Sequence, residues 1–144
     1  MIITFFGHSD FIATKTTEEK LDAILSGIPN DEKVDFYLGG YGRFDSFAYT
    51  CAKKYQISHP NAKLIFVTPY ISEKYIKKRA DGYDEIIYPE LENTMEKFSI
   101  PHRNKWMIKK ADIVITYVEH SSGGAYTAYK YAKKIGKNII NLIE

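Results

Sequence analysis

Short apolar stretches alternate with longer amphipathic stretches along the chain, and this alternation constrains the fold more than any other feature of the sequence. The apolar stretches lie at residues 2–6, 34–38, 63–68, 83–88, 112–118 and 138–143. Those near the C-terminus are almost continuously apolar, which suits strands that are buried on both faces of a sheet. We therefore predict an α/β fold, a Rossmann-like, doubly wound and mainly parallel sheet flanked by helices.

The amphipathic stretches predict the helices between these strands. Thr16 is the expected N-cap of the first helix, with Glu19 as its capping-box partner. A second helix is expected from Phe44, and its apolar face includes Cys51, which predicts a buried thiol in the core. Further helices are expected at 72–80, at 103–110 and from 125 to Gly136. No repeat or linker interrupts the pattern, so residues 1–144 are expected to form one domain.

Composition excludes several classes of function. Twenty Lys and Arg against 18 Asp and Glu give a net charge of +2, too small to indicate a nucleic-acid partner. The basic run at 74–79 is interpreted as a solvated helix face. No apolar stretch reaches the ~18 residues of a membrane helix, and the N-terminal apolar run is shorter than a signal peptide. A lone cysteine and isolated histidines predict a cytoplasmic protein with no disulfide, no metal site and no cofactor.

Three loops rich in glycine or serine follow predicted strands and enter predicted helices. In a parallel sheet these loops lie at one edge, outside the carboxyl ends of the strands. Glycine allows the backbone to approach a ligand closely, and a helix N-terminus presents free N–H groups to anions such as phosphate. The residues expected to line a ligand site there are Gly7, His8, Ser9, Gly39, Gly40, Tyr41, Gly42, Ser121, Ser122, Gly123 and Gly124.

Several short motifs occur in a fixed order along the chain. They are Gly7-His8, GGYGRFD at 39–45, RNKWM at 103–107, AD at 111–112 and SSGGAYT at 121–127. This set resembles the YpsA-like branch of the SLOG superfamily, whose Rossmann-like domains bind nucleotides or nucleotide-derived ligands. The resemblance spans nearly the whole chain. It implies a parallel sheet flanked by helices, with a nucleotide-like small molecule at the glycine loops.

The same superfamily contains LOG-type phosphoribohydrolases, whose signature is an Arg followed by PGGxGTxxE. Here Arg103 precedes Gly123-Gly124 and Thr127, which match, whereas Lys130 stands at the position of the glutamate. That carboxylate is expected to assist cleavage of the N-glycosidic bond. Its replacement by lysine predicts that the protein does not efficiently hydrolyse nucleoside monophosphates.

The preferred interpretation is a sensor or binding module for a nucleotide-like or phosphoribosyl molecule. Glycine backbone amides would hold its phosphate and Arg103 would neutralise it, so Arg103→Ala is expected to weaken binding and leave the fold intact. Asn104, Thr127 and Asp45 would address the ribose or the phosphate rim. The tyrosines expected near the site, one of which would stack on the base, are Tyr41, Tyr70, Tyr117 and Tyr126.

Two alternatives stay open. In the first, the protein is an N-glycosidase or phosphoribohydrolase with Asp45 or Glu119 as the acid or base. In the second, it is a DNA-binding or protein-interaction module. The tyrosines within the helices would also suit a homodimer contact.

Overall fold

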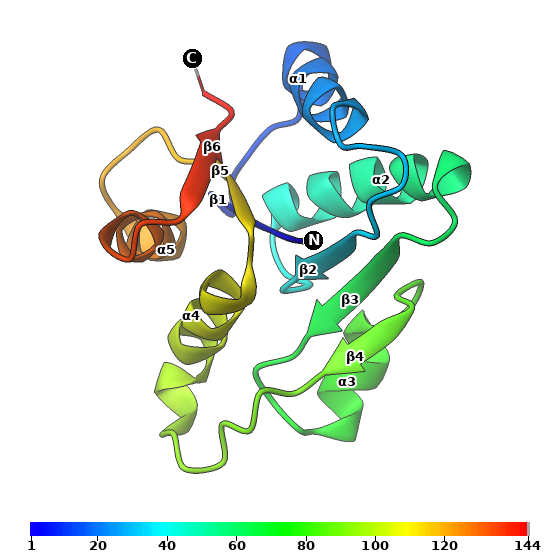
Figure 1. Cartoon of the computed structure of the whole chain (residues 1–144). Coiled ribbons are helices and arrows are strands. Elements are labelled where there is room, and N and C mark those ends of the chain that lie inside the picture. Colours follow the sequence, from blue (N-terminus) through cyan, green and yellow to red (C-terminus); the bar gives the residue numbers. More distant parts are fainter. Residues whose placement is uncertain (144) are drawn as a thin grey trace.

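The computed structural model describes residues 1–143 and forms a central sheet covered by helices on both faces (Figure 1). The strands are β1 (Ile2–Gly7), β2 (Asp35–Leu38), β3 (Lys63–Val67), β4 (Glu85–Ile87), β5 (Ile113–Tyr117) and β6 (Asn138–Asn141). The helices are α1 (Lys15–Ser26), α2 (Arg43–Ser58), α3 (Glu73–Arg79), α4 (Ser99–Lys110) and α5 (Gly123–Lys134), and a 3₁₀ turn, η1 (Glu96–Phe98), precedes α4.

All the pairings in this six-stranded sheet are parallel, and the strand order is β4-β3-β2-β1-β5-β6. The central strand β1 pairs through Ile3 with Phe36 of β2 on one side and with Ile113 of β5 on the other. The order reverses between β1 and β5, so the loops that follow these two strands leave toward opposite faces. Such a reversal opens a crevice at the carboxyl edge of the sheet. The predicted fold class is confirmed.

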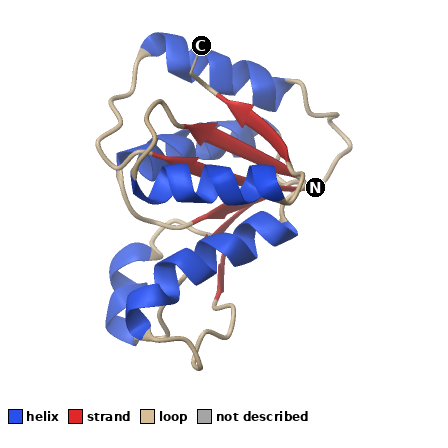
Figure 2. Cartoon of the chain, turned by 90° about the vertical axis from the view of Figure 1, so that its left-hand side faces the viewer, coloured by secondary structure: helices blue, strands red, loops and turns tan. Residues whose placement is uncertain are grey.

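Helices cover the sheet on both faces (Figure 2), and each face carries its own hydrophobic core. On one face, Leu21 of α1 and Phe44 of α2 pack over the inner strands. On the other, Met107 of α4 and Ala128 of α5 pack over Val114. Because both faces are covered, the inner strands are apolar almost throughout, which is the pattern the sequence displays.

Cys51 of α2 is buried, as predicted, and burial raises the pKa of its thiol to about 12. The thiol therefore stays protonated at neutral pH and acts as a core side chain. No helix within residues 1–143 is long and apolar enough to cross a membrane.

Three helices begin at least two residues earlier than the sequence pattern predicts: α1, α4 and α5, the last of which begins at Gly123 instead of residue 125. The N-cap of α1 is Thr14, not Thr16: its backbone is extended, and its hydroxyl accepts a hydrogen bond from the N–H of Thr17 at 3.2 Å. Helix α4 begins at Ser99, four residues before Arg103. Its first turn contains Pro101, which is tolerated there because the first N–H groups of a helix have no partner within the helix.

Candidate functional site

The loops after β1, β2 and β5 meet in one cavity of about 420 Å³ at the carboxyl edge of the sheet, below called the edge pocket. Helices α3 and α4 complete its wall. The predicted site residues that line it are Gly7, His8, Ser9, Gly39, Tyr41, Asp45, Arg103, Asn104, Ser122, Gly123 and Gly124. The topology accounts for this convergence, because the pocket lies beside the point where the strand order reverses.

Other predicted site residues lie outside the edge pocket. Gly40 and Gly42 line an adjoining hollow on the outer side of the β2–α2 loop. Glu119 lines a third hollow, together with His8. Ser121 lines none of these, and Thr127 is exposed on α5, where its hydroxyl donates to the carbonyl of Gly123 at 3.1 Å.

The N-terminus of α5 is the open part of the edge pocket. Gly123 has φ +89, a left-handed conformation that favours glycine, and it follows the N-cap Ser122. A Cβ added at Gly123 or Gly124 would meet no protein atom within 4 Å. The space beside these two glycines is therefore open to the edge pocket that they line, and an anion near the first N–H groups of α5 has room to bind there.

The guanidinium of Arg103 forms the floor of the pocket and is bonded mainly to the protein itself. It is buried, and its Nη1 donates to the carbonyls of Gly39 at 3.1 Å and Val67 at 2.7 Å. Its Nε donates to Oδ1 of Asn104 at 2.9 Å. Arg103 thus ties the ends of β2 and β3 to α4, and removing it would leave two buried carbonyls without donors. The expectation that Arg103→Ala leaves the fold intact does not fit this geometry.

Gly39 is glycine because the guanidinium lies against it. A Cβ at this position would be 2.9 Å from Nη2 of Arg103. The close approach of backbone and arginine therefore depends on the missing side chain.

The carboxylate of Asp45 lies where the backbone N–H groups of the β2–α2 loop could otherwise bind an anion. Its Oδ2 accepts a hydrogen bond from the N–H of Tyr41 at 3.1 Å. Burial raises the pKa of Asp45 to about 6, while Arg103 and the backbone N–H groups of Tyr41, Gly40 and Gly39 oppose the rise. The backbone of this loop already holds a carboxylate, so the free anion position of the pocket is at α5.

His8 and His120 form a stacked pair at the rim, with ring centroids 3.6 Å apart and planes at 8°. Nε2 of His8 accepts the N–H of Glu119 at 3.0 Å, which leaves Nδ1 to carry the proton of the neutral ring. Burial first, and His120 second, lower the pKa of His8, while Asp10 and Glu119 oppose this. The lowered pKa keeps His8 uncharged at neutral pH, and the stacked pair joins the end of β1 to the loop that leads into α5.

Eight lining residues escape sequence reasoning. They are Phe5, Phe6, Asp10, Tyr75 of α3, Ile100 and Met107 of α4, His120 and Ala125. A signal for Tyr75 does exist, because the loop after β3 reaches the same sheet edge as the three glycine loops. Ile100 could be found only by knowing that α4 begins at Ser99.

Of the four tyrosines expected near the site, Tyr41 lines the pocket. Tyr117 instead packs edge-to-face on Phe11, with ring centroids 4.8 Å apart. Tyr126 lies beneath Nζ of Lys130 at 5.3 Å, so Lys130 remains on the exposed side of α5. Tyr70 lies beside Tyr75, with ring centroids 5.0 Å apart, and does not line the pocket.

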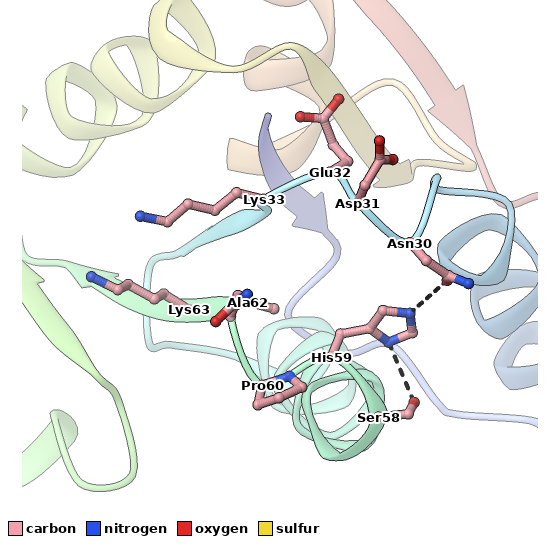
Figure 3. A pocket seen from close by; sticks show the side chains of 10 residues that line it. Asn30, Asp31, Glu32, Lys33, Ser58, His59, Pro60, Ala62 and Lys63 are labelled. Carbon is pink, nitrogen blue, oxygen red and sulfur yellow. Dashed lines mark hydrogen bonds between the residues drawn. The ribbon is translucent and has the colours of Figure 1, made fainter.

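A larger cavity, of about 700 Å³, lies at the opposite edge, where β2 and β3 begin (Figure 3). Its central side chain is His59, which stacks on Tyr55 and is hydrogen-bonded to Asn30 at 3.1 Å. Lys63 on its rim pairs with Glu85. This cavity has no glycine loop, and its histidine is already held by the protein, so the edge pocket is the better candidate.

No protein-family model and no curated protein matches the sequence. Solved structures do match in fold. DNA processing protein A (DprA) from Streptococcus pneumoniae superposes with a TM-score of 0.64 at 17% identity, over 95% of this chain and 48% of that chain. TM1055, a structural genomics target, has a TM-score of 0.60 at 11% identity, over 96% and 71%.

DprA from Helicobacter pylori, whose structure is described for its single-stranded DNA binding mode, has a TM-score of 0.58 at 16% identity, over 96% of this chain and 63% of that chain. This chain therefore spans about half of the first DprA. Identities this low show the fold alone. The chain has the Rossmann-like fold of these proteins.

Proposed function

We propose that the edge pocket binds a nucleotide-like or phosphoribosyl small molecule, and that the chain is a cytoplasmic member of the YpsA-like branch of the SLOG superfamily. The observation that carries the proposal is the open N-terminus of α5 inside a pocket that also contains Arg103. Free backbone N–H groups, the positive end of a helix and a buried guanidinium together favour phosphate.

Each part of such a ligand has a suited partner in the pocket. The phosphate binds the backbone of Gly123 and Gly124. The ribose hydroxyls donate to Asp45, whose carboxylate lines the pocket beside the β2–α2 loop. The base lies toward Tyr75 and Asn104. Because Oδ1 of Asn104 already accepts from Arg103, its NH₂ group is left to donate to an acceptor on the base.

The raised pKa of Asp45 favours hydrolysis as a second candidate function. A carboxyl group with a pKa of about 6 exchanges its proton near neutral pH, as a general acid for the departing base must. Lys130 stands where LOG-type enzymes carry their glutamate and is exposed, so Asp45 would be the acid on this route. Release of free base from nucleoside monophosphates, lost in Asp45→Asn, would establish the enzyme; no release supports the binding module.

The first test is native mass spectrometry of the protein as purified, followed by calorimetry with a panel of nucleoside mono- and diphosphates. The proposal expects a retained or titratable ligand with a phosphate group. Binding of single-stranded DNA without binding of any free nucleotide would contradict it and favour the nucleic-acid alternative.

The substitution Gly124→Ala tests the position assigned to the phosphate. A methyl group there meets no protein atom and favours the helix, so the melting temperature should not fall. It does enter the space assigned to the phosphate, and losing one charge-assisted bond weakens affinity by about tenfold or more. Gly27→Ala, at the end of α1 and outside the pocket, is the control. Unchanged affinity in Gly124→Ala would refute the assigned phosphate position.

A further inference from the structure

The β2–α2 loop separates the edge pocket from a second hollow of about 460 Å³ on its outer side, below called the arginine hollow. It is lined by Ser9, Gly40, Tyr41, Gly42, Arg43, Ser46 and Arg79. This lining contains two arginines, three hydroxyl groups (those of Ser9, Tyr41 and Ser46) and no carboxylate. Ser9 and Tyr41 line both spaces, so the hollow and the edge pocket meet at these two residues.

Neither arginine has an anionic partner among residues 1–143. The side chain of Arg43 makes no hydrogen bond or ion pair there. Arg79 stacks on two rings, with its guanidinium carbon 5.4 Å from the ring centre of Tyr41 and 4.7 Å from that of Tyr75. Its Nε is buried and has no hydrogen-bond partner. A buried donor of a charged group without a partner is costly, and an anion in the hollow would supply one.

Arg79 is also set apart from the other cations of its helix. Lys74, Lys77 and Lys78 are exposed on α3 and line none of these cavities, as expected for a solvated face. Arg79 instead turns toward the glycine loop, where two aromatic rings hold its planar group in place. Stacking on rings leaves the edge of a guanidinium free for bidentate contacts to a phosphate.

We propose that the arginine hollow is a second anion subsite, so that the ligand carries two separated phosphate groups, one at α5 and one between Arg43 and Arg79. This inference rests on the proposed function, because the first phosphate is the one assigned to the edge pocket. The ligand crosses from one space to the other over Ser9 and Tyr41. A nucleoside with phosphates at its 3′ and 5′ positions has this chemistry, and so does a short single-stranded nucleic acid.

The test compares the 5′-monophosphate with the 3′,5′-bisphosphate of adenosine, guanosine, cytidine and uridine by calorimetry. A charge-assisted contact at an open site predicts about tenfold tighter binding of the bisphosphate. That advantage should disappear in Arg43→Gln and in Arg79→Gln. Lys78→Gln removes one positive charge from α3 outside the hollow, as a control for Arg79→Gln. This variant should still bind the bisphosphate more tightly than the monophosphate.

The outcomes separate the two proposals. If no monophosphate or bisphosphate binds, the proposed function fails and the second subsite fails with it. If a monophosphate binds but its bisphosphate gains nothing, or gains equally in Arg79→Gln, the second subsite alone is wrong. A 5′-phosphorylated dinucleotide identifies the source: tighter binding than the bisphosphate, lost in Arg79→Gln, supports a nucleic-acid ligand at the subsite, and weaker binding supports a free small molecule there.

Discussion

Replacing Asp45 with asparagine should stabilise the protein at neutral pH and remove one component of its pH dependence. Burial raises the pKa of this carboxyl group from 3.8 to about 6, so folding favours the protonated form. At about 1.4 kcal/mol per pKa unit, the rise corresponds to about 3 kcal/mol. Because Asp45 keeps partial exposure to solvent, about 3 kcal/mol is the upper end of the expected effect.

The direction follows from the order of the two pKa values. The folded-state pKa of Asp45 lies above the unfolded-state value, so its stabilising contribution is complete below pH 3.8 and is lost as the pH rises through about 6. Asparagine has the shape of the neutral carboxyl group, and its Oδ1 can still accept the N–H of Tyr41. The variant and the wild type should therefore be equally stable near pH ~4, and the variant more stable by about 2–3 kcal/mol near pH ~8.

Urea unfolding of both proteins at steps between these two pH values measures the effect. Other titrating groups cancel in the difference between the two curves. Asp10→Asn, which removes an exposed carboxylate from the same pocket, controls for the loss of a negative charge. A difference in stability that is the same at both ends of the pH range, or a wild type that is the more stable protein near pH ~8, would refute the argument.

Three further predictions concern Arg103, His8 and the cap of α1. Arg103→Ala should lower the free energy of unfolding by about 3–5 kcal/mol in urea titrations, because it leaves buried acceptors without a donor; an unchanged value would show that the arginine is not structural. In a proton NMR titration, the pKa of His8 should lie below 6.5, and His120→Ala should raise the pKa of His8. An unchanged pKa of His8 in that variant would contradict the pairing. Thr14→Ala should cost about 1 kcal/mol through the lost cap of α1, with Thr16→Ala as the matched control.

Much of the fold could be predicted from the sequence because its signals are local. Apolar runs and helical periodicity place every strand and helix, and parallel strands joined by helices leave few topologies. The errors lie at helix starts. Three threonines at positions 14, 16 and 17 all suit a cap, and the choice of Thr14 depends on the path of the preceding loop rather than on sequence spacing.

The sequence predicts which loops form the site, but not all of the contacts within it. Chain order and the parallel sheet are enough to bring Gly39 and Gly123 to one edge. The contacts within the site are not all encoded locally. The N–H of Tyr41 binds the carboxylate of Asp45, four residues further along the chain, whereas Arg103 binds carbonyls that are 64 and 36 residues away. The position of the Arg103 side chain therefore depends on contacts between elements far apart in the sequence.

A crystal structure of the protein with the tightest-binding nucleotide of the calorimetric panel tests the central claim most directly. The account predicts phosphate oxygens within about 3 Å of the backbone nitrogens at Gly123 or Gly124, with the sugar beside Asp45. A nucleotide seated in the cavity around His59 at the opposite edge, or held only on the surface of the basic helix α3, would contradict it.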